Sequence, residues 1–255
     1  MYQFNNAIVR RPGKSLISGL TEANQGIPDY NIAFQQHQKY INALIQCGLN
    51  VEILDAVEAF PDSVFIEDVA IITPHCAIIT RPGAPTRSGE IEGMRSVLDS
   101  YRSQIEEIIA PGTLEGGDVM QIDNHFYIGL SHRTNSAGAE QLIAILERYG
   151  MTGSTVSLSD FLHLKTGVTS LDEDTLIASG EFVNKNEFSD FKIMKVDETE
   201  IEAANCIRIN DFILMPAGNP RTRNALCLPG VQVIEIDISE FAKLDGGLTC
   251  LSLRF

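Results

Sequence analysis

One structural unit, a β-hairpin followed by a helix and a further strand, recurs along this 255-residue chain with unequal spacing. Each hairpin is predicted by two short apolar runs around a polar turn. We expect four such hairpins, at 69–80, 119–130, 168–179 and 206–216. The last three turns are rich in Asp and Asn, which adopt the backbone conformations of tight turns. Recurrence of one unit is typical of internal duplication, and it favours a repeat architecture.

Helices and further strands are expected between the hairpins. Apolar residues recur at steps of three and four over three ranges, which predicts helices at 28–47, 88–109 and 135–149. Asn135 is the expected N-cap of the third helix, and Gly48 and Gly150 are expected C-terminal stops. Shorter helical signals lie at 184–192 and 221–228. Strands are expected at 49–54, 108–111, 154–159, 192–196 and 231–236.

A fifth hairpin is expected to be split between the two ends of the chain. The segment AIVRRPG (7–13) nearly repeats AIITRPG (77–83), so it should be the second strand of its own unit, with LTCLSLRF (248–255) as the first. If this split unit closes a ring, the C-terminal strand is held between neighbours. No linker or low-complexity tract interrupts the sequence, and we therefore expect a single domain over 1–255. The alternative is an ordinary α/β sheet with coincidental similarity between segments.

Chemically reactive residues lie just before the first strand of several units. In a ring these positions converge at one end, and a cysteine, a histidine and several acids brought together form a candidate site for covalent catalysis. Each residue also has a structural interpretation, as a buried small hydrophobe for the cysteine, a hydrogen-bonded core residue for the histidine, and solvated turns for the acids. The residues concerned are Asp62, Glu67, Asp68, Glu115, Asp118, His163 and Cys250.

Composition excludes several classes of function. A net charge of −15 argues against nucleic-acid binding and is compatible with a cationic small substrate. No apolar run approaches the ~18 residues of a membrane span, and the N-terminal residues lack the order of a signal peptide. The five cysteines are scattered without a CxxC pair, which is typical of a reducing compartment. We therefore expect a cytoplasmic protein, and the absence of HxH and HExxH spacings predicts no metal or other cofactor.

Several longer motifs occur in order over nearly the whole chain. They are SGLTEANQGIPDYNIAFQQHQKY, FIEDVAIIT, ITRPGAPTRSGE, TLEGGDV, IGLSHRTN, LHLKTG, AANCI and LDGGLTC. Through these motifs the sequence resembles the dimethylarginine dimethylaminohydrolases of the guanidine-modifying superfamily. The resemblance implies a five-bladed pseudo-symmetric α/β propeller of hairpin–helix–strand repeats around a central active site. It also implies hydrolysis of Nω-methylated arginine to citrulline and a methylamine.

The resemblance implies three catalytic residues. Cys250 matches the nucleophile that attacks the guanidinium carbon and forms a covalent thiouronium intermediate. His163 matches the general acid and base, a role that suits imidazole because its ordinary pKa of ~6.5 lies near the working pH. Glu115 matches the carboxylate that orients and polarises the histidine, although many relatives have Asp there.

The resemblance also implies how the substrate is held. Asp68 and Asp62 match carboxylates that face the guanidinium nitrogens, and Glu67 is expected on the same wall. Two arginines are expected to bind the substrate carboxylate, and two leucines are expected to offer backbone contacts. These four residues are Arg87, Arg133, Leu20 and Leu244. Relatives occur as monomers and homodimers, and both states stay open.

Two other functions remain open from the sequence. An arginine deiminase or an amidinotransferase would share the cysteine, the histidine and the acids, although arginine deiminases are usually longer. A non-catalytic binder of arginine-like amino acids would need neither Cys250 nor His163. For the enzyme, we expect the cationic substrate to stabilise the Cys250 thiolate, so that the nucleophile forms fully only when substrate is bound.

Overall fold

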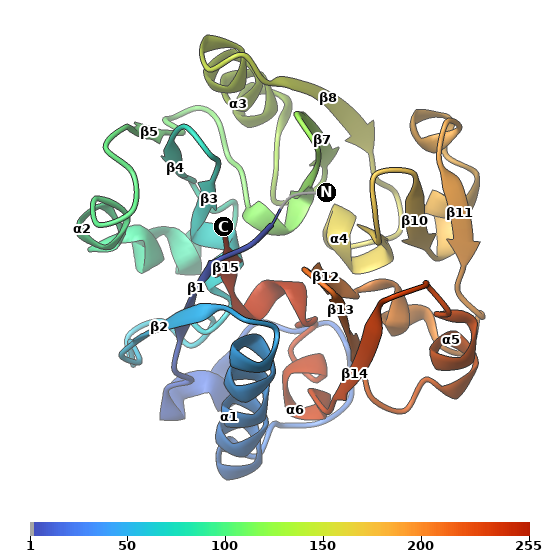
Figure 1. The fold of residues 1–255 in the computed structure, drawn as a ribbon. Helices are drawn as coiled ribbons and strands as arrows, with labels where there is room; N and C mark the ends of the chain where they lie inside the picture. Colours follow the sequence, from blue (N-terminus) through green and yellow to red (C-terminus); the bar gives the residue numbers. More distant parts are fainter. Residues whose placement is uncertain (1–2) are drawn as a thin grey trace.

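The computed structural model describes residues 3–255, and these residues form a ring of five three-stranded sheets (Figure 1). In each sheet, or blade, the innermost strand runs antiparallel to the middle strand, which runs parallel to the outer one. The predicted five-bladed α/β propeller is confirmed. From the inside outward the blades are β15 (Leu253–Arg254), β1 (Asn6–Arg10) and β2 (Asn50–Leu54); β3 (Ala70–Ile72), β4 (Ala77–Ile79) and β5 (Ile105–Glu107); β6 (Val119–Ile122), β7 (His125–Leu130) and β8 (Thr152–Ser157); β9 (Val168–Ser170), β10 (Thr175–Ala178) and β11 (Lys192–Lys195); and β12 (Ile207–Ile209), β13 (Phe212–Pro216) and β14 (Gln232–Ile236).

The first blade is split between the chain ends, as the sequence predicts. Strand β15 pairs with β1 in the register Ala7 to Arg254, and the two ends of the chain therefore meet near the middle of the ring (Figure 1). The backbone N–H groups of Asn5 and Asn6 both donate to the carbonyl of Phe255, at 3.0 and 2.8 Å. The C-terminal strand is consequently held by its neighbours.

The two long helices lie on the outside of the ring and begin at the residues that the sequence indicates. Asp29 caps α1 by accepting hydrogen bonds from two backbone N–H groups, and Asn135 caps α3 by accepting one from Gly138. Gly48 and Gly150 follow these helices with positive φ angles of 90° and 75°, as expected for C-terminal stops. The helices are α1 (Tyr30–Gln46), α2 (Met94–Leu98), α3 (Ser136–Arg148), α4 (Leu164–Gly167), α5 (Pro220–Ala225) and α6 (Ser239–Ala242). Short 3-10 turns include η1 (Lys14–Ser18), η3 (Pro85–Ile91), η5 (Gly180–Asn184) and η6 (Asn186–Phe188).

The prediction of a helix over 88–109 is wrong. That range holds the end of η3, the five-residue α2 and all of β5. The strand expected at 108–111 is therefore also misplaced, because β5 covers 105–107 and ends before it. Gly93 separates the two helical pieces because its φ of 78° is left-handed. Ile105 then pairs with Ala77 of β4, and tertiary pairing overrides the helical spacing of the apolar residues. Of the two weaker helical signals, the first falls on η5 and η6 and the second on α5.

The hydrophobic core is divided into wedges between neighbouring blades. Five clusters of buried apolar side chains occur among the described residues, and each joins elements of two adjacent blades. One cluster, for example, joins Ile8 of β1 to Ala77 of β4, and another joins Ile122 of β6 to Leu176 of β10. Because the apolar side chains fill these gaps, the end of the ring axis is left to polar groups.

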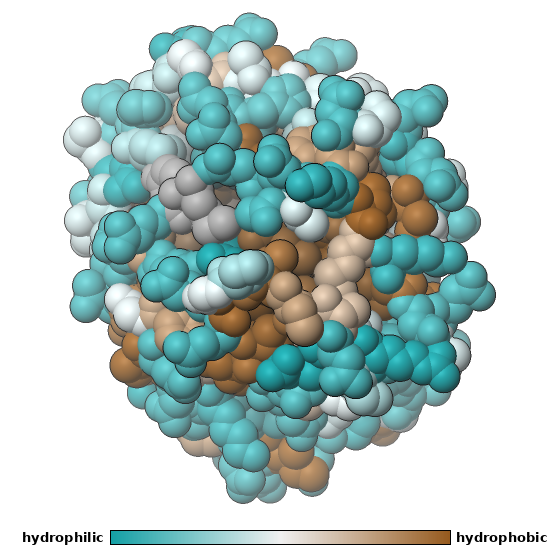
Figure 2. Space-filling model, turned by 45° about the vertical axis from the view of Figure 1, so that its right-hand side comes forward, coloured by the Kyte–Doolittle hydropathy of each residue, from teal (hydrophilic) through white to brown (hydrophobic). Residues whose placement is uncertain are grey.

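The outer surface is mainly polar. Hydrophilic residues cover most of the face in Figure 2, with hydrophobic residues gathered toward its middle. Within 3–255 no helix is both long and apolar enough to cross a lipid bilayer. All five cysteines are free thiols, with Cys227 exposed and Cys47, Cys76 and Cys206 buried.

Candidate active site

A short helical turn precedes the innermost strand of every blade, and these five turns surround the ring axis. The reactive residues of the sequence lie on or beside them: Glu67 and Asp68 on the first, Glu115 and Asp118 on the second, His163 directly before the third, and Cys250 on the last. The expected convergence is therefore observed. The turns are η2 (Ile66–Val69), η4 (Gly116–Asp118), α4 (Leu164–Gly167), η7 (Ile201–Ala204) and η8 (Thr249–Leu251).

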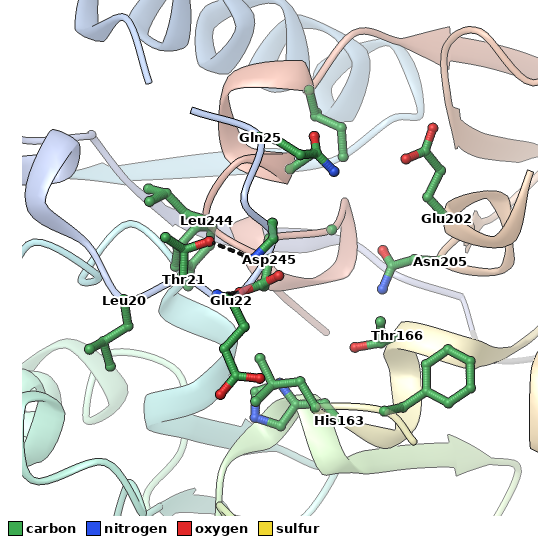
Figure 3. Close-up of a pocket in the computed structure, with 18 of the residues that line it drawn as sticks. Leu20, Thr21, Glu22, Gln25, His163, Thr166, Glu202, Asn205, Leu244 and Asp245 are labelled. Carbon is green, nitrogen blue, oxygen red and sulfur yellow. Dashed lines mark hydrogen bonds between the residues drawn. The ribbon is translucent and has the colours of Figure 1, made fainter. Parts of the chain in front are cut away.

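A cavity of about 660 Å³ opens between these turns. Figure 3 shows His163 and Thr166 at one side of it, Leu20 and Thr21 at another, and Asn205 facing them. Seven of the predicted site residues line this cavity: Leu20, Asp62, Asp68, Arg87, Arg133, His163 and Leu244. The other three, Glu67, Glu115 and Cys250, are not among its lining residues.

His163 and Glu115 form a buried ion pair. The imidazole Nε2 lies 2.7 Å from Glu115 Oε2, and the Glu115 carboxylate is completely buried. Burial alone would lower the pKa of His163, but Asp68, Asp118 and Glu115 outweigh it and raise that pKa to about 9. The histidine is therefore an imidazolium at neutral pH.

Glu115 is held by further donors. Its Oε1 accepts from the backbone N–H of Gly83 at 3.0 Å and lies 3.4 Å from Arg133 Nη1. Burial opposes ionisation of Glu115, but His163 and the two nearby arginines lower its pKa to about 2. The carboxylate is thus fixed, charged and directed at His163.

Cys250 lies on η8 and is partly exposed. Its Sγ accepts a hydrogen bond from the Gly247 N–H at 3.4 Å. Burial raises the pKa of Cys250 to about 12, and the charges of Glu67 and Asp68 act in the same direction. Without a ligand the thiol is therefore neutral. Asp68 acts on both Cys250 and His163, which makes it the common electrostatic neighbour of the two groups.

The Gly-Gly pairs of LEGGD and LDGG allow the turns to approach closely. A Cβ on Gly117 would lie 2.6 Å from His163 Nδ1, and a Cβ on Gly247 would lie 2.5 Å from Asn205 Cγ. Neither distance is compatible with a side chain, so glycine is required for packing at both positions. The two motifs therefore share one function, which is to bring the turns of neighbouring blades together.

The three predicted substrate acids differ in their surroundings. Asp68 faces the cavity, accepts from the Gly117 N–H at 2.9 Å and is 2% exposed. Asp62 also faces the cavity, and burial raises its pKa. Glu67 does not line this cavity. Its Oε1 instead lies 2.6 Å from Lys165 Nζ and 2.8 Å from Arg254 Nη2, beside a smaller second cavity.

The two predicted carboxylate-binding arginines are also unequal. Arg87 is 4% exposed, and its guanidinium already binds Asp68 at 2.6 Å and Glu90 at 2.8 Å. These carboxylates outweigh the effect of burial and raise the pKa of Arg87 well above its ordinary value. The Arg133 side chain is 18% exposed, and its ion pair with Glu115 is long, at 3.4 Å. Arg133 is therefore the freer cation in the cavity wall.

The segment after η1 covers one side of the cavity (Figure 3). The Leu20 N–H donates to Asp62 Oδ1 at 2.9 Å, and the Glu22 N–H donates to Asp245 Oδ2 at 2.7 Å. Leu244 is buried next to this second contact and lines the cavity. The segment is thus tied both to a predicted substrate acid and to the loop that precedes Cys250.

Sequence reasoning gave no role to four residues that shape this site. Asp118 accepts from the Leu164 N–H at 3.0 Å and helps to charge His163, while Lys165 and Arg254 both hold Glu67. Asn205 lines the cavity and contacts η8. The sequence signal that could have identified Asp118 and Asn205 as site residues is their position, because both lie where an innermost strand begins.

A metal-compatible group also exists here. Within the described part of the chain, one set of at least three His, Cys, Asp or Glu side chains has its possible ligand atoms within 4.8 Å of one another, and it consists of Asp68, Glu115 and His163. Sequence spacing could not indicate it, since the three residues come from three turns. The guanidinium of Arg87, 2.6 Å from Asp68 and 3.8 Å from Glu115, already provides a cation at this position. The group therefore fits an ion pair better than a metal centre.

Comparison with known proteins gives matches over most of the chain. Residues 55–213 match a sequence model of the family described as arginine deiminase. The chain is 51% identical over 253 residues to N(G),N(G)-dimethylarginine dimethylaminohydrolase of Pseudomonas aeruginosa, covering 99% of this chain and 100% of that protein. It is 36% identical to the protein of the same name from Streptomyces coelicolor, covering 97% and 96%. A solved structure of the P. aeruginosa protein, a cysteine-to-serine variant complexed with citrulline, matches with a TM-score of 0.98 at 50% identity and covers 100% of both chains.

Proposed function

The chain belongs to the dimethylarginine dimethylaminohydrolase family, and on this premise we propose that it hydrolyses Nω-methylated arginines to citrulline and mono- or dimethylamine through a thiouronium intermediate on Cys250. The observation that carries the proposal is the buried His163–Glu115 pair, whose Nε2 and Oε2 atoms lie 2.7 Å apart. His163 and Asp68 line one cavity, and the negative charge of Asp68 acts both on the His163 imidazole and on the Cys250 thiol.

In the first half of the reaction the Cys250 thiolate attacks the central guanidinium carbon. A C–S bond forms, the C–N bond to the methylated nitrogen breaks, and that nitrogen takes a proton from His163. Protonation is needed because an amide-like nitrogen anion is a poor leaving group. The raised pKa of His163, about 9, supports this role because the imidazolium is already present at neutral pH.

In the second half a water molecule cleaves the intermediate. Its oxygen bonds to the thiouronium carbon, one of its protons passes to the now neutral His163, and the C–S bond breaks with the electron pair returning to sulfur. The oxygen loses its second proton and becomes the ureido oxygen of citrulline, while sulfur takes up one proton from solvent as the product leaves and the neutral thiol is restored. Glu115 keeps the imidazole oriented throughout and stabilises its charged form, as the orienting carboxylate does in other triads.

The thiol requires activation by the substrate. Because the pKa of Cys250 is about 12 without a ligand, only a small fraction of it ionises near neutral pH. A guanidinium bound beside Asp68 would bring a positive charge next to sulfur and favour the thiolate. The nucleophile therefore forms mainly in the complex with substrate.

At the guanidinium end, we assign Asp68 and Asp62 as direct acceptors of the substrate N–H groups. Both carboxylates are buried and both line the cavity. Glu67 acts on the same wall indirectly, since its Oε1 is taken by Lys165 and Arg254. Its negative charge still contributes to the field at Cys250.

At the amino-acid end, we assign Arg133 as the main partner of the substrate carboxylate because it is the freer of the two arginines. Arg87 can join it when Asp68 turns from Arg87 to the substrate guanidinium. Leu20 supplies a backbone contact to the α-amino group of the substrate, and Leu244 supplies one near the nucleophile. Both residues line the cavity.

The coarser features of the protein follow the same proposal. Turns or loops from all five blades line one cavity, which supports a single catalytic domain over 1–255. Five free thiols support a reducing compartment such as the cytoplasm. We assign a small cationic amino acid as the ligand and leave monomer and homodimer as the two expected assemblies.

The experiment is a citrulline assay with asymmetric dimethylarginine, monomethylarginine and arginine as parallel substrates. We expect turnover of the methylated substrates, loss of turnover in Cys250→Ser, and full turnover in Cys227→Ser, whose thiol is exposed and does not line the cavity. Preference for arginine over both methylated forms would favour an arginine deiminase activity, the family named by the model that matches 55–213. Binding of dimethylarginine without any citrulline would favour a non-catalytic binder.

A further inference from the structure

Asn205 links two turns that carry catalytic side chains. Its Oδ1 accepts from the backbone N–H of Thr249 at 2.9 Å, and its Nδ2 donates to Thr249 Oγ1 at 3.1 Å. The same Nδ2 donates to the backbone carbonyl of Lys165 at 2.7 Å. Thr249 directly precedes Cys250, and Lys165 is two residues after His163. Asn205 is 4% exposed, so these bonds have little competition from water.

Equivalent links join other turns of the ring. Asp68 of η2 accepts from the Gly117 N–H of η4 at 2.9 Å, and Asp118 of η4 accepts from the Leu164 N–H of α4 at 3.0 Å. Asn205 makes the corresponding bond from η7 to η8. A side chain at the start of one innermost strand thus fixes the turn of the following blade, and the link to the nucleophile turn uses an amide instead of a carboxylate.

The amide has two properties that a carboxylate lacks. It donates to the Lys165 carbonyl while accepting from Thr249, whereas a carboxylate would bring two acceptor oxygens together at 2.7 Å. It is also uncharged. The charged groups that act on the Cys250 thiol are already Glu67, Asp68 and Lys165, and a third carboxylate would disfavour the thiolate further.

We propose that Asn205 is a positioning residue for the reaction, which holds the Cys250 turn against the turn that begins at His163 and keeps negative charge away from the thiol. It also sets the loop before the nucleophile. A Cβ on Gly247 would lie 2.5 Å from the Asn205 carboxamide, and the Gly247 N–H donates to Cys250 Sγ. The inference rests on the proposed function, because it assumes that Cys250 and His163 act on one substrate.

The test compares Asn205→Asp and Asn205→Ala with the matched control Asn210→Asp. Asn210 also links two backbone segments, because it accepts from the Phe4 N–H and donates to the carbonyls of Phe4 and Cys47, but it does not line the active-site cavity. Two quantities are measured: kcat per mole of titrated Cys250, and the rate of Cys250 alkylation by iodoacetamide at pH 8, followed by peptide mass spectrometry. The exposed Cys227 in the same molecule is the internal control for reagent and pH.

We expect kcat to fall about 10- to 100-fold in both Asn205 variants, the rate equivalent of losing one buried hydrogen bond, with a much smaller change in KM. In Asn205→Asp the added carboxylate should raise the pKa of Cys250, and alkylation of Cys250 should slow about tenfold for each pKa unit of that rise. In Asn205→Ala no charge is added, so alkylation of Cys250 should not slow. Alkylation of Cys227 should be unchanged, and Asn210→Asp should keep the parent's kcat per titrated Cys250 and its rate of Cys250 alkylation, whatever stability it loses with the bonds to Phe4 and Cys47.

Unchanged kcat in both Asn205 variants would overturn the proposal, since a purely structural residue would lower the amount of folded protein but not the rate per active site. Equal alkylation rates in Asn205→Asp and the parent would also overturn it. If Asn205→Ala does not fold, Asn205→Ser replaces it, because its hydroxyl is too short to span both turns. Failure of the parent to form citrulline would reject the proposed function instead, while the alkylation rates would still decide whether Asn205 controls the thiol.

Discussion

Replacing Glu115 by Gln tests the origin of the charge on His163. The substitution keeps the shape of a completely buried side chain and removes its negative charge. In the parent, Glu115 Oε2 lies 2.7 Å from His163 Nε2, and together with Asp68 and Asp118 it overcomes burial to raise the pKa of His163 to about 9. Asp68 and Asp118 remain in the variant, so the change isolates the contribution of Glu115.

The magnitude follows from the value in the parent. A hydrogen bond to a charged group contributes about 1.5–3 kcal/mol, which corresponds to about one to two pKa units. We therefore expect the pKa of His163 to fall from about 9 to roughly 7–8 in Glu115→Gln. At pH 8.5 the protonated fraction of His163 should fall from about three quarters to about one quarter or less. Because this proton is transferred to the leaving amine, kcat should decline at lower pH in the variant than in the parent.

Stability should change in the same pH window. The folded-state pKa of His163, about 9, lies above the ordinary value of 6.5, so protonation stabilises the folded protein. That contribution is complete below pH 6.5, is lost as the pH rises through 9, and amounts to at most about 3 kcal/mol. In Glu115→Gln the free energy of unfolding should vary less between pH 6.5 and 9.

The direct assay is an NMR titration of histidine-labelled protein from pH 5 to 10, with the His163 signal assigned by its absence in His163→Asn. The matched control is Glu240→Gln, which alters another buried, hydrogen-bonded glutamate that binds Lys243 and has no contact with His163. A parent His163 that titrates at or below 6.5, or an equal pKa in the parent and in Glu115→Gln, would refute the reasoning.

Three further predictions concern other charged groups. Without substrate, the difference in thiolate absorbance at 240 nm between the parent and Cys250→Ser should stay near zero up to about pH 10, because the pKa of Cys250 is about 12. A titration midpoint well below that of an ordinary thiol would show that the substrate is not needed to ionise Cys250. Glu67→Gln should lower the free energy of unfolding in urea by about 3–5 kcal/mol, because Lys165 and Arg254 would keep buried charges without their shared partner; a loss below about 1 kcal/mol would contradict this. His37 is fully buried, and burial, aided by Arg11, lowers its pKa to about 4. Urea unfolding at each pH should therefore show stability falling by at most about 3 kcal/mol between pH 6.5 and 4 in the parent and in the exposed-site control His132→Leu, but not in His37→Leu.

The elements that sequence predicted well are those fixed by local chemistry. The hairpin turns at Asp123 and Asn210 adopt positive φ angles of 49°, which Asx residues tolerate, and the predicted cap Asn135 binds its own helix N-terminus. The range 88–109 failed because its structure is decided by distant residues. Strand β5 forms by pairing with β4, and this partner is absent from any local pattern.

The same division holds for the candidate site. Alignment of the repeated units identified the positions that converge, because a ring brings equivalent positions together. It could not show that Arg87 is already bound by Asp68 and Glu90, or that Glu67 faces Lys165 and Arg254 instead of the main cavity. Such pairings depend on which side chains face each other across a blade boundary, at distances of a few ångströms that sequence spacing does not encode.

The placement of the nucleophile near the C-terminus follows from the closure of the ring. Because the apolar clusters lie between blades, the turns at the axis are free to carry polar side chains without weakening the core. The turn with Cys250 is held from three directions: by β15 pairing with β1, by Asn205 of the neighbouring blade, and by Arg254, which donates to the Thr249 carbonyl at 3.0 Å while binding Glu67. A terminal segment with these constraints is as well positioned as an internal one, and its rigidity depends on the same blade contacts that assemble the rest of the site.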